Sequence, residues 1–364
     1  MKIDGTSYRS VWVDPQDGFS IHILDQTKLP WAVDILRLTR AAEAAHAIRT
    51  MQVRGAPLIG AVAAYGVALA VHADASSEAM ERDCAMLAAA RPTAVNLRWA
   101  IERMLTRLRN TRVEDRTAVA YQEAGLIADE DVLQCEAIGR FGAPLIEQFA
   151  LREPGRRVQV LTHCNAGWLA TVDWGTALAP IYKAFEQGID LHVWVDETRP
   201  RNQGASLTAW ELGKHGVAHT VVADNAGGHL MQHGEVDLVI VGADRVTRTG
   251  DVANKIGTYL KALAARDNGV PFWVAAPSTT VDWTIDDGIA DIPIEERNEA
   301  EVTSVTGRNE LGSIETVRVV PETSPAANPA FDVTPSRLVT GLVTERGRCD
   351  ATADGLLSLF PERS

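Results

Sequence analysis

A cysteine stands where an apolar stretch of the chain ends abruptly. Residues 158–167 read Val-Gln-Val-Leu-Thr-His-Cys-Asn-Ala-Gly, which predicts a buried strand with Cys164 just past its carboxyl end. Ligands of doubly wound sheets bind at that edge, so a thiol placed there can meet a substrate. A helix starting after Gly167 would lower the pKa of the thiol and favour the thiolate. A small buried side chain explains a lone cysteine equally well.

A carboxylate follows a second apolar stretch. Residues 237–243 read Asp-Leu-Val-Ile-Val-Gly-Ala and lead directly to Asp244. On its own, Asp244 is explained most simply as the cap of a turn or as the partner of Arg245. Beside a thiol at another strand end of the same sheet, however, it could serve as a general acid and base. Cys164 and Asp244 together therefore predict an active site.

Two segments that contain arginine suit an anionic ligand. Arg54 precedes Gly55, Ala56 and a proline, a residue favoured in the first turn of a helix. Backbone N–H groups at a helix start and a guanidinium fork can bind a phosphate together, although an exposed arginine at a helix boundary is the commoner case. Arg91 begins a second segment of this kind, Arg-Pro-Thr-Ala-Val-Asn-Leu. In an acidic chain, such isolated cationic spots would suit a sugar phosphate.

Two further loops carry amide and amine side chains next to expected strand ends. Residues 196–204, Asp-Glu-Thr-Arg-Pro-Arg-Asn-Gln-Gly, include Gln203, whose amide could bind sugar hydroxyls through both its oxygen and its nitrogen. Residues 251–257 place Asn254 and Lys255 at the expected start of a helix, where they would suit hydroxyl and phosphate groups. A capped surface helix with an exposed lysine is an equally good interpretation.

Several common active-site motifs do not occur in this sequence. No GxGxxG follows the first strand of the expected sheet, and the chain has neither a GxxxxGK[ST] loop nor a GxSxG elbow. The pairs His215 with His219 and His229 with His233 have the spacing of metal ligands, but they lack the glutamate of HExxH. We interpret them as structural or solvent-facing. We expect no nicotinamide or nucleotide cofactor and no metal ion.

Composition narrows the range of partners. The chain has 48 acidic residues against 35 Lys and Arg, a formal net charge of -13, which argues against nucleic acid or an anionic membrane as a partner. Residues 55–73 lack charged side chains, but Ala, Gly and Pro are frequent there, so we expect a packed interior helix rather than a membrane span. Four widely spaced cysteines without a CxxC pair, and a start without an apolar secretory segment, predict a cytoplasmic protein.

The pattern of apolar residues predicts two domains. Residues 10–24 suggest a small hairpin, and helical spacing then continues from residue 32 to about 104 and again to 151. After a linker at 152–157, short apolar runs at 158–161, 191–195, 220–222, 238–241 and 272–275 alternate with helical patterns such as 168–187, 205–214 and 255–266. Such alternation is typical of a parallel, doubly wound α/β sheet. We therefore expect a mainly helical domain over 1–151 and a Rossmann-like catalytic domain over 157–364.

Six segments, taken in order, resemble one family of enzymes. The chain is similar to the S-methyl-5-thioribose-1-phosphate isomerases in residues 54–60, 91–97, 162–167, 196–205, 242–246 and 250–257. The resemblance spans nearly the whole chain and is more specific than any single motif. The same superfamily contains ribose-1,5-bisphosphate isomerases and the regulatory subunits of the eukaryotic initiation factor 2B exchange complex.

The resemblance implies a function and a set of site residues. It implies conversion of 5-methylthioribose 1-phosphate into 5-methylthioribulose 1-phosphate in methionine salvage, by a cytoplasmic homodimer. It assigns Cys164 and Asp244 as the catalytic pair, and as substrate contacts Arg54, Gly55, Ala56, Arg91, Gln203, Asn254 and Lys255. Ser206 stands where many relatives have arginine, which leaves room for 5-deoxyribose 1-phosphate as a second substrate. The alternatives are a ribose-1,5-bisphosphate isomerase and a regulatory subunit that binds a sugar phosphate or nucleotide without catalysis.

Overall fold

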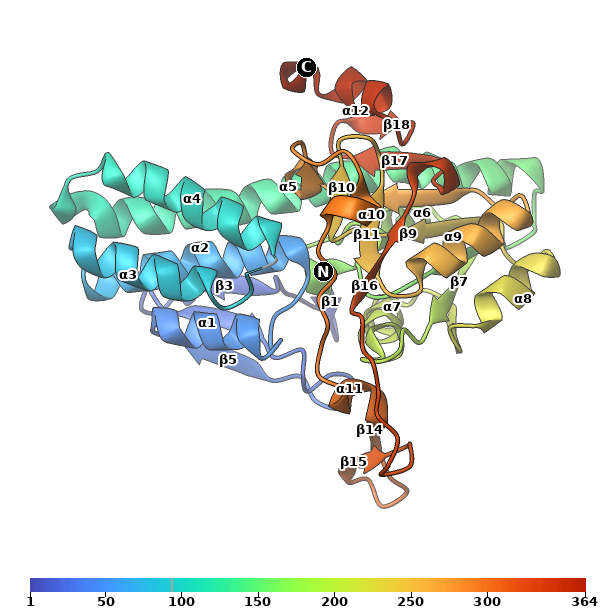
Figure 1. The fold of residues 1–364 in the computed structure, drawn as a ribbon, viewed down its shortest axis with the longest axis horizontal. Coiled ribbons are helices and arrows are strands. Elements are labelled where there is room, and N and C mark those ends of the chain that lie inside the picture. Colours follow the sequence, from blue (N-terminus) through green and yellow to red (C-terminus); the bar gives the residue numbers. More distant parts are fainter. Residues whose placement is uncertain (93) are drawn as a thin grey trace.

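The structure is a computed structural model that describes residues 1–92 and 94–364. The predicted α/β class is confirmed: a mainly helical N-terminal part precedes a mostly parallel sheet (Figure 1). The N-terminal elements are β1 (Lys2–Ile3), β2 (Thr6–Ser7), β3 (Val11–Val13), β4 (Ile21–Leu24), β5 (Ile35–Leu38), α1 (Ala41–Arg49), α2 (Ala56–Ala73), α3 (Ser77–Ala88), α4 (Val95–Arg109) and α5 (Arg116–Arg152).

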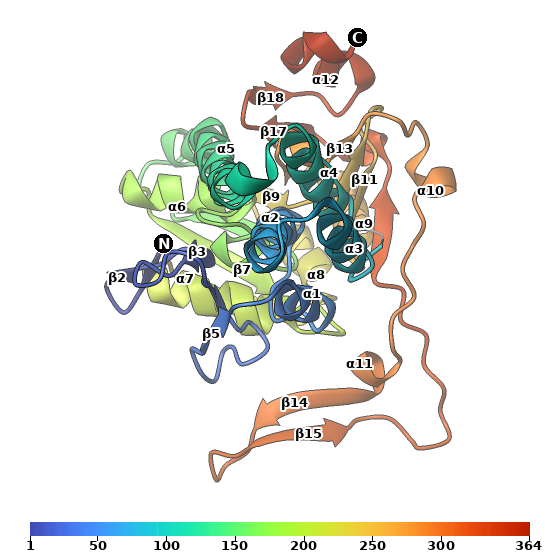
Figure 2. The same cartoon turned by 90° about the vertical axis from the view of Figure 1, so that its left-hand side faces the viewer.

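Helix α2 forms the core of the N-terminal part. It carries no Asp, Glu, Lys or Arg, and its apolar residues are buried on every side of the helix, which is typical of a helix enclosed by others. Figure 2 shows α2 surrounded by α1, α3 and α4, and it also packs against α5. Although α2 is long and apolar enough to cross a membrane, 78% of it is buried inside the protein. The expectation of a packed interior helix is therefore met.

Seven strands form the main sheet, in the order β18-β17-β12-β9-β6-β7-β8. All neighbours are parallel except β17 and β18. Strands and connecting helices are β6 (Val158–Thr162), α6 (Leu178–Glu186), β7 (Leu191–Asp196), α7 (Ala209–His215), β8 (His219–Val222), α8 (Ala226–Gln232), β9 (Leu238–Val241), α9 (Thr258–Asp267), β12 (Phe272–Ala275), β17 (Gly341–Thr344), β18 (Gly347–Cys349) and α12 (Ala353–Leu359).

Side chains alternate between two apolar layers on the faces of this sheet. Val160 and Ile240 pack with residues of α5, α6 and α7 on one face, whereas Leu161 and Val241 pack with residues of α8, α9 and α12 on the other. Both faces are covered, which explains why these strands read as continuous apolar runs in the sequence.

The order of the strands reverses between β6 and β9. From β6 the chain proceeds outward through β7 to β8, then returns to β9 on the other side of β6 and proceeds through β12 to β17. The carboxyl ends of β6 and β9 therefore border the switch point, where open α/β sheets bind their ligands. Cys164 follows β6 by two residues and Asp244 follows β9 by three.

A second sheet and a projecting hairpin complete the structure. The second sheet has the order β13-β10-β11-β16, and β14 pairs with β15 in a hairpin that stands away from the body (Figure 2). Their bounds, with those of two short helices, are β10 (Arg245–Thr247), β11 (Val252–Lys255), β13 (Val281–Asp282), α10 (Gly288–Asp291), α11 (Ala300–Thr303), β14 (Ser304–Arg308), β15 (Ile314–Arg318) and β16 (Phe331–Thr334).

The element predictions hold for the main sheet and fail at several connections. All five predicted strands of the sheet and the N-terminal hairpin are present. The helical pattern assigned from residue 32 is wrong at its start, where Ile35–Leu38 forms a strand, and only Leu178–Glu186 of the helix expected at 168–187 is α-helical. Helix α5 packs on both α2 and α6, so the division into 1–151 and 157–364 stays a prediction.

Candidate functional site

Cys164 is held in a strained backbone conformation at the end of β6. Its φ of 67° lies in the left-handed region, which non-glycine residues seldom adopt and which often marks functional sites. Two threonines fix this conformation: the Cys164 N–H donates to Thr198 Oγ1 at 2.8 Å, and Thr208 Oγ1 donates to the Cys164 carbonyl oxygen at 2.8 Å. Cys164 as a whole is 7% exposed. Loops after two adjacent strands, β6 and β7, thus position the sulfur.

The predicted lowering of the Cys164 pKa is wrong. After Gly167 the chain forms only a short 3-10 turn over Trp168–Ala170, and helix α6 begins later, at Leu178. Burial raises the pKa of the thiol, and the positive charges of Arg54 and Lys255 only partly oppose this effect. The neutral thiol is therefore the form favoured by these surroundings.

The start of helix α2 faces the cysteine. Arg54, Gly55 and Ala56 line a cavity of about 30 Å³ together with Cys164, Asp244 and Asn254, among other residues. Gly55 has a φ of 92°, and a side chain there would collide with the backbone of Ala170. This close approach, open only to glycine, brings the N-terminus of an 18-residue helix to the switch point.

Asp244 connects this cavity with a second one. The adjoining cavity of about 50 Å³ is lined by Ala56, Arg91 and Asp244, among other residues. The Arg91 guanidinium lies 3.6 Å from a carboxylate oxygen of Glu295, and burial lowers the pKa of Arg91 although Asp244 and Glu295 favour its charge. Arg91 and Asp244, 153 positions apart in the sequence, therefore line the same cavity.

Asn254 and Lys255 lie on strand β11, not at the start of a helix as predicted; helix α9 begins three residues later, at Thr258. Both residues are 5% exposed. The Asn254 amide donates to Thr258 Oγ1 at 3.0 Å, and Lys255 Nζ donates to the Ala330 carbonyl oxygen at 2.9 Å. Burial lowers the pKa of Lys255, whereas Cys164 and Asp244 act in the opposite direction. Lys255 thus places a buried amine near both candidate catalytic groups.

Gln203 lines a much larger cavity of about 670 Å³, which also borders Arg54 and Ser206. Gln203 is 4% exposed, and its side-chain oxygen has no hydrogen-bond partner among the described residues. Residues of α11 and of the β14–β15 hairpin close the far side of the cavity. Arg54 therefore lies between the small cavity at Cys164 and the large one at Gln203.

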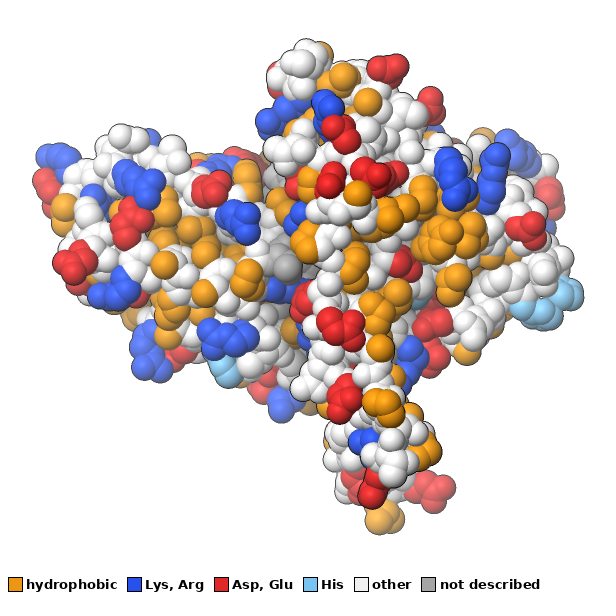
Figure 3. Space-filling view, viewed as in Figure 1, with side chains coloured by type: hydrophobic (Ala, Val, Ile, Leu, Met, Phe, Trp, Pro, Cys, Tyr) orange, Lys and Arg blue, Asp and Glu red, His pale blue; other side chains and the backbone are white. Residues whose placement is uncertain are grey.

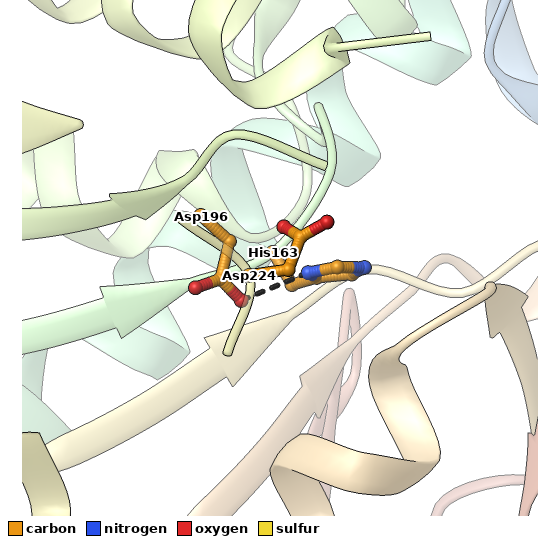
Figure 4. Close-up of side chains that lie close together, drawn as sticks. All are labelled: His163, Asp196 and Asp224. Atoms are coloured by element: carbon orange, nitrogen blue, oxygen red, sulfur yellow. Dashed lines mark hydrogen bonds and ion pairs between the residues drawn. The ribbon is translucent and has the colours of Figure 1, made fainter. Parts of the chain in front are cut away.

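A cluster of buried polar residues next to Cys164 was not predicted from the sequence. His163 Nδ1 lies 2.9 Å from Asp196 Oδ2 (Figure 4). Its Nε2 lies 2.8 Å from the Ile256 carbonyl oxygen, so the ring joins the ends of β6 and β7 to the loop after Lys255. The adjacent Asp224 accepts the N–H groups of the loop at 198–199. The only sequence signal was the position of His163 and Asp196 at strand ends.

This cluster has the donor types of a metal site. One ligand atom each from His163, Asp196 and Asp224 lie within 4.8 Å of one another. However, Lys261 Nζ lies 3.2 Å from Asp196 Oδ2 and also contacts the Asp224 carbonyl oxygen. A lysine ammonium thus already supplies positive charge to the Asp196 carboxylate. We interpret the cluster as a hydrogen-bonded support for the strand ends.

Comparison with known proteins connects this site to a family. Residues 52–351 match the model of the initiation factor 2 subunit family. The chain is 67% identical to the methylthioribose-1-phosphate isomerase of Acidiphilium cryptum (strain JF-5) and 65% identical to that of Gluconobacter oxydans (strain 621H), in each case over 100% of this chain and 99% of the relative. The chain belongs to the methylthioribose-1-phosphate isomerases of this family.

Solved structures agree with this placement. The 5-methylthioribose 1-phosphate isomerase of Pyrococcus horikoshii OT3 is 37% identical, with a TM-score of 0.83 and full coverage of both chains. A structure from A. fulgidus, described as the delta subunit of translation initiation factor eIF-2B, is 40% identical with a TM-score of 0.82, covering 98% of this chain and 100% of that one. Isomerases and initiation-factor subunits of this family thus share one fold, so the side chains of the site must distinguish them.

Proposed function

We propose that this protein converts 5-methylthioribose 1-phosphate into 5-methylthioribulose 1-phosphate, as a step of methionine salvage. Membership of the isomerase family supports this function. The observation that carries it is the meeting of Cys164 and Asp244 at the switch point, facing the N-terminus of α2. A thiol and a carboxylate can supply acid–base catalysis, and the N–H groups at the start of α2 can bind a phosphate, which together suit isomerisation of a sugar phosphate.

The sizes of the cavities constrain how the substrate lies. The cavity at Cys164, about 30 Å³, holds about two water molecules and is too small for a pentose phosphate. The neighbouring cavity of about 670 Å³ is large enough. We propose that the substrate extends from the large cavity past Arg54 to Cys164, with Arg54, Gly55, Ala56, Arg91, Asn254 and Lys255 contacting its phosphate or hydroxyls and Gln203 contacting its sugar.

The reaction must open a locked ring before hydrogen can move. Phosphate on the anomeric oxygen prevents spontaneous opening, so Asp244, in its protonated form, donates to the ring oxygen as the bond from that oxygen to the anomeric carbon breaks. Hydrogen then moves from the neighbouring carbon to the anomeric carbon. The hydroxyl on the neighbouring carbon becomes the ketone and returns its proton to Asp244, which restores the enzyme.

Two routes for the moving hydrogen differ in what they require of Cys164. In a proton route, the Cys164 thiolate removes the proton from the neighbouring carbon and returns it to the anomeric carbon through an enediol-type intermediate. In a hydride route, hydrogen passes directly with its electron pair, and the neutral Cys164 thiol assists at the carbon that loses it without becoming a thiolate. Because burial raises the pKa of Cys164, the resting thiol is better suited to the hydride route.

The test is phosphorus and proton NMR of the purified protein with 5-methylthioribose 1-phosphate. The ketose phosphate should form, and Cys164→Ala should abolish its formation. In deuterated water, deuterium at the anomeric carbon of the product would demonstrate the proton route, and complete retention of the original hydrogen would indicate hydride transfer or a proton shielded from solvent. A folded protein without turnover would refute the function and favour a non-catalytic subunit or a bisphosphate isomerase.

Three finer predictions accompany this function. We propose that the protein acts as a homodimer in the cytoplasm, which sedimentation analysis and cell fractionation would test.

Ser206 donates to the Asn202 carbonyl oxygen at 2.7 Å on the wall of the large cavity. A serine there leaves that cavity without the charge of an arginine, so we expect 5-deoxyribose 1-phosphate to be accepted as well. The same NMR assay tests this substrate.

A further inference from the structure

A buried glutamate lies behind the arginine of the site. Glu211, on helix α7, is 1% exposed, and its carboxylate receives three donors. Oε1 accepts from the Asn165 amide nitrogen at 2.5 Å, and Oε2 accepts from the Trp168 N–H and from the Tyr182 hydroxyl, each at 2.9 Å. Nothing in the proposed reaction uses Glu211. Its contacts nevertheless lead directly to a residue that does take part.

Asn165 connects Glu211 to Arg54. The Arg54 guanidinium donates to the Asn165 side-chain oxygen through Nη1 at 2.5 Å and to the Asn165 carbonyl oxygen through Nη2 at 2.8 Å. A guanidinium has five N–H donors, so this pair leaves donors on Arg54 for a substrate phosphate. The Asn165 amide nitrogen therefore donates to the Glu211 carboxylate and, at 3.2 Å, to Thr208 Oγ1, and the amide oxygen accepts from Arg54.

Only one orientation of the Asn165 amide matches donors with acceptors on both of its sides. Burial raises the pKa of Glu211 to about 7, but the hydrogen bonds from Asn165, Tyr182 and Trp168 favour its ionised form. An ionised carboxylate can only accept hydrogen bonds, so above this pH Glu211 requires the nitrogen of the Asn165 amide to face it. The amide oxygen must then face Arg54. If the amide turned over, two oxygens would face each other at Glu211 and two donors would face each other at Arg54.

We propose that Glu211 is a positioning residue that fixes the orientation of the Asn165 amide and, through it, holds the Arg54 guanidinium toward the substrate phosphate. The proposal rests on the proposed function in one respect, namely that Arg54 contacts the substrate. Two other features fit this role. The burial of Glu211 excludes water that could otherwise satisfy a misoriented amide. Gly167 has no side chain, and any Cβ there would collide with the Glu211 carboxylate.

The variant Glu211→Gln replaces the oxygen that accepts from Asn165 by an NH₂ group that donates. The introduced amide oxygen can keep the Trp168 N–H and the Tyr182 hydroxyl, so its NH₂ group faces Asn165. The Asn165 amide must then turn over and present its own NH₂ to Arg54. We expect KM for 5-methylthioribose 1-phosphate to rise about tenfold or more, because a hydrogen bond to a charged group is lost, while kcat changes by less than about threefold.

A double variant restores the pairing of a donor with an acceptor between positions 211 and 165. In Glu211→Gln with Asn165→Asp, the introduced glutamine donates to the introduced carboxylate, whose other oxygen accepts from Arg54. The number of charges is the same as in the parent. We expect KM to return to within about threefold of the parent value, although Asn165→Asp alone should raise KM because it sets two carboxylates against each other.

Tyr182→Phe is the matched control. It removes a hydrogen bond from the same Glu211 carboxylate but leaves the polarity toward Asn165 intact, so KM should stay within about twofold of the parent. Equal rises of KM in Tyr182→Phe and Glu211→Gln would show a merely structural role and refute the proposal. So would an unchanged KM in Glu211→Gln, or a double variant no better than the single one.

The orientation itself provides a readout that does not depend on activity. In a crystal structure of the Glu211→Gln variant, Arg54 Nη1 should no longer lie within hydrogen-bonding distance of the Asn165 side chain. An intact pair would refute the positioning role even if the double variant failed to fold. Failure of the proposed function is a separate result, because it would appear as a lack of turnover by the parent protein.

Discussion

Asp131 gives the stability of this protein a pH dependence that can be worked out in advance. Asp131 lies on helix α5 and is buried. Its Oδ2 accepts a hydrogen bond at 2.7 Å from the N–H of Val172, a residue eight positions after Cys164. Burial raises the pKa of Asp131 from 3.8 to about 7, and the hydrogen bond from Val172 only partly offsets that rise. The folded protein therefore retains a proton that the unfolded chain has lost between these two pH values.

The sign of the effect follows from this retention. The contribution of Asp131 to stability is fully present below pH 3.8, is lost progressively as the pH rises toward about 7, and is constant above that. Each pH unit below the folded-state pKa adds about 1.4 kcal/mol to the free energy of unfolding. At pH 5, two units below a pKa of about 7, Asp131 therefore contributes about 3 kcal/mol. The variant Asp131→Asn has no such proton and loses this dependence.

Urea denaturation of the parent and of Asp131→Asn at pH 5 and pH 8 tests this reasoning. The difference in the free energy of unfolding between the two proteins should shift by about 3 kcal/mol in favour of the variant on going from pH 5 to pH 8. Steric and hydrogen-bonding effects of the amide are the same at both pH values and cancel. Parallel pH profiles for the two proteins would refute the assignment of a buried, proton-retaining Asp131.

The remaining predictions concern the site. Cys164→Ala and Asp244→Asn should each lower kcat by about 100-fold or more while thermal unfolding stays cooperative, and full activity in either variant would contradict their assignment as the catalytic pair. Arg54→Lys keeps the charge but loses the fork that engages Asn165, so KM should rise about tenfold or more; an unchanged KM would show that the fork is not required. Gly55→Ala should destabilise the protein by about 2 kcal/mol in urea titrations, because φ of 92° and the Ala170 backbone both oppose a side chain.

The main sheet could be predicted because its strands are buried on both faces. Strands such as Leu238–Val241 are apolar throughout and end in glycine or polar residues, which marks both their length and their carboxyl ends. Cys164 and Asp244 could be found for the same reason, since each follows such an end. The switch point depends on the spatial order of the strands, which no local pattern reveals.

Short and partly polar strands escaped prediction. Strand β11 reads Val-Ala-Asn-Lys and β5 reads Ile-Leu-Arg-Leu, and neither has a length or alternation that distinguishes it from a helix boundary. The helix expected at 168–187 was interrupted by loop contacts such as the Thr176 N–H to the Ala166 carbonyl oxygen. Glu211 was missed because a single glutamate in a helical pattern is usually exposed, and only tertiary packing buries it.

The distribution of charge shows why the site had to be recognised by its buried residues. Lys and Arg side chains are intermingled with Asp and Glu over the helical part of the face in Figure 3, and they do not gather into one basic patch there. The cationic groups of the site are instead enclosed: Arg54 is 8% exposed and Lys255 is 5% exposed. A phosphate that reaches them leaves water behind, so each charge-assisted hydrogen bond is stronger than it would be at the surface.

The contacts around the loop after β6 indicate from which side a substrate enters. Ser10 Oγ donates to the Trp168 carbonyl oxygen at 2.8 Å, and the Gln26 amide donates to the Leu169 carbonyl oxygen at 2.6 Å. Asp131 and Arg54 make similar contacts with residues 172 and 165. The N-terminal part is thus hydrogen-bonded to the loop after β6 at several positions between residues 165 and 172. Opening the site here would break several buried hydrogen bonds at once, each costly to leave unmade. Gln26 and Arg54 also line the large cavity bounded by α11 and the β14–β15 hairpin, so a substrate in that cavity reaches Cys164 without breaking these bonds, and we expect the sugar phosphate to enter there.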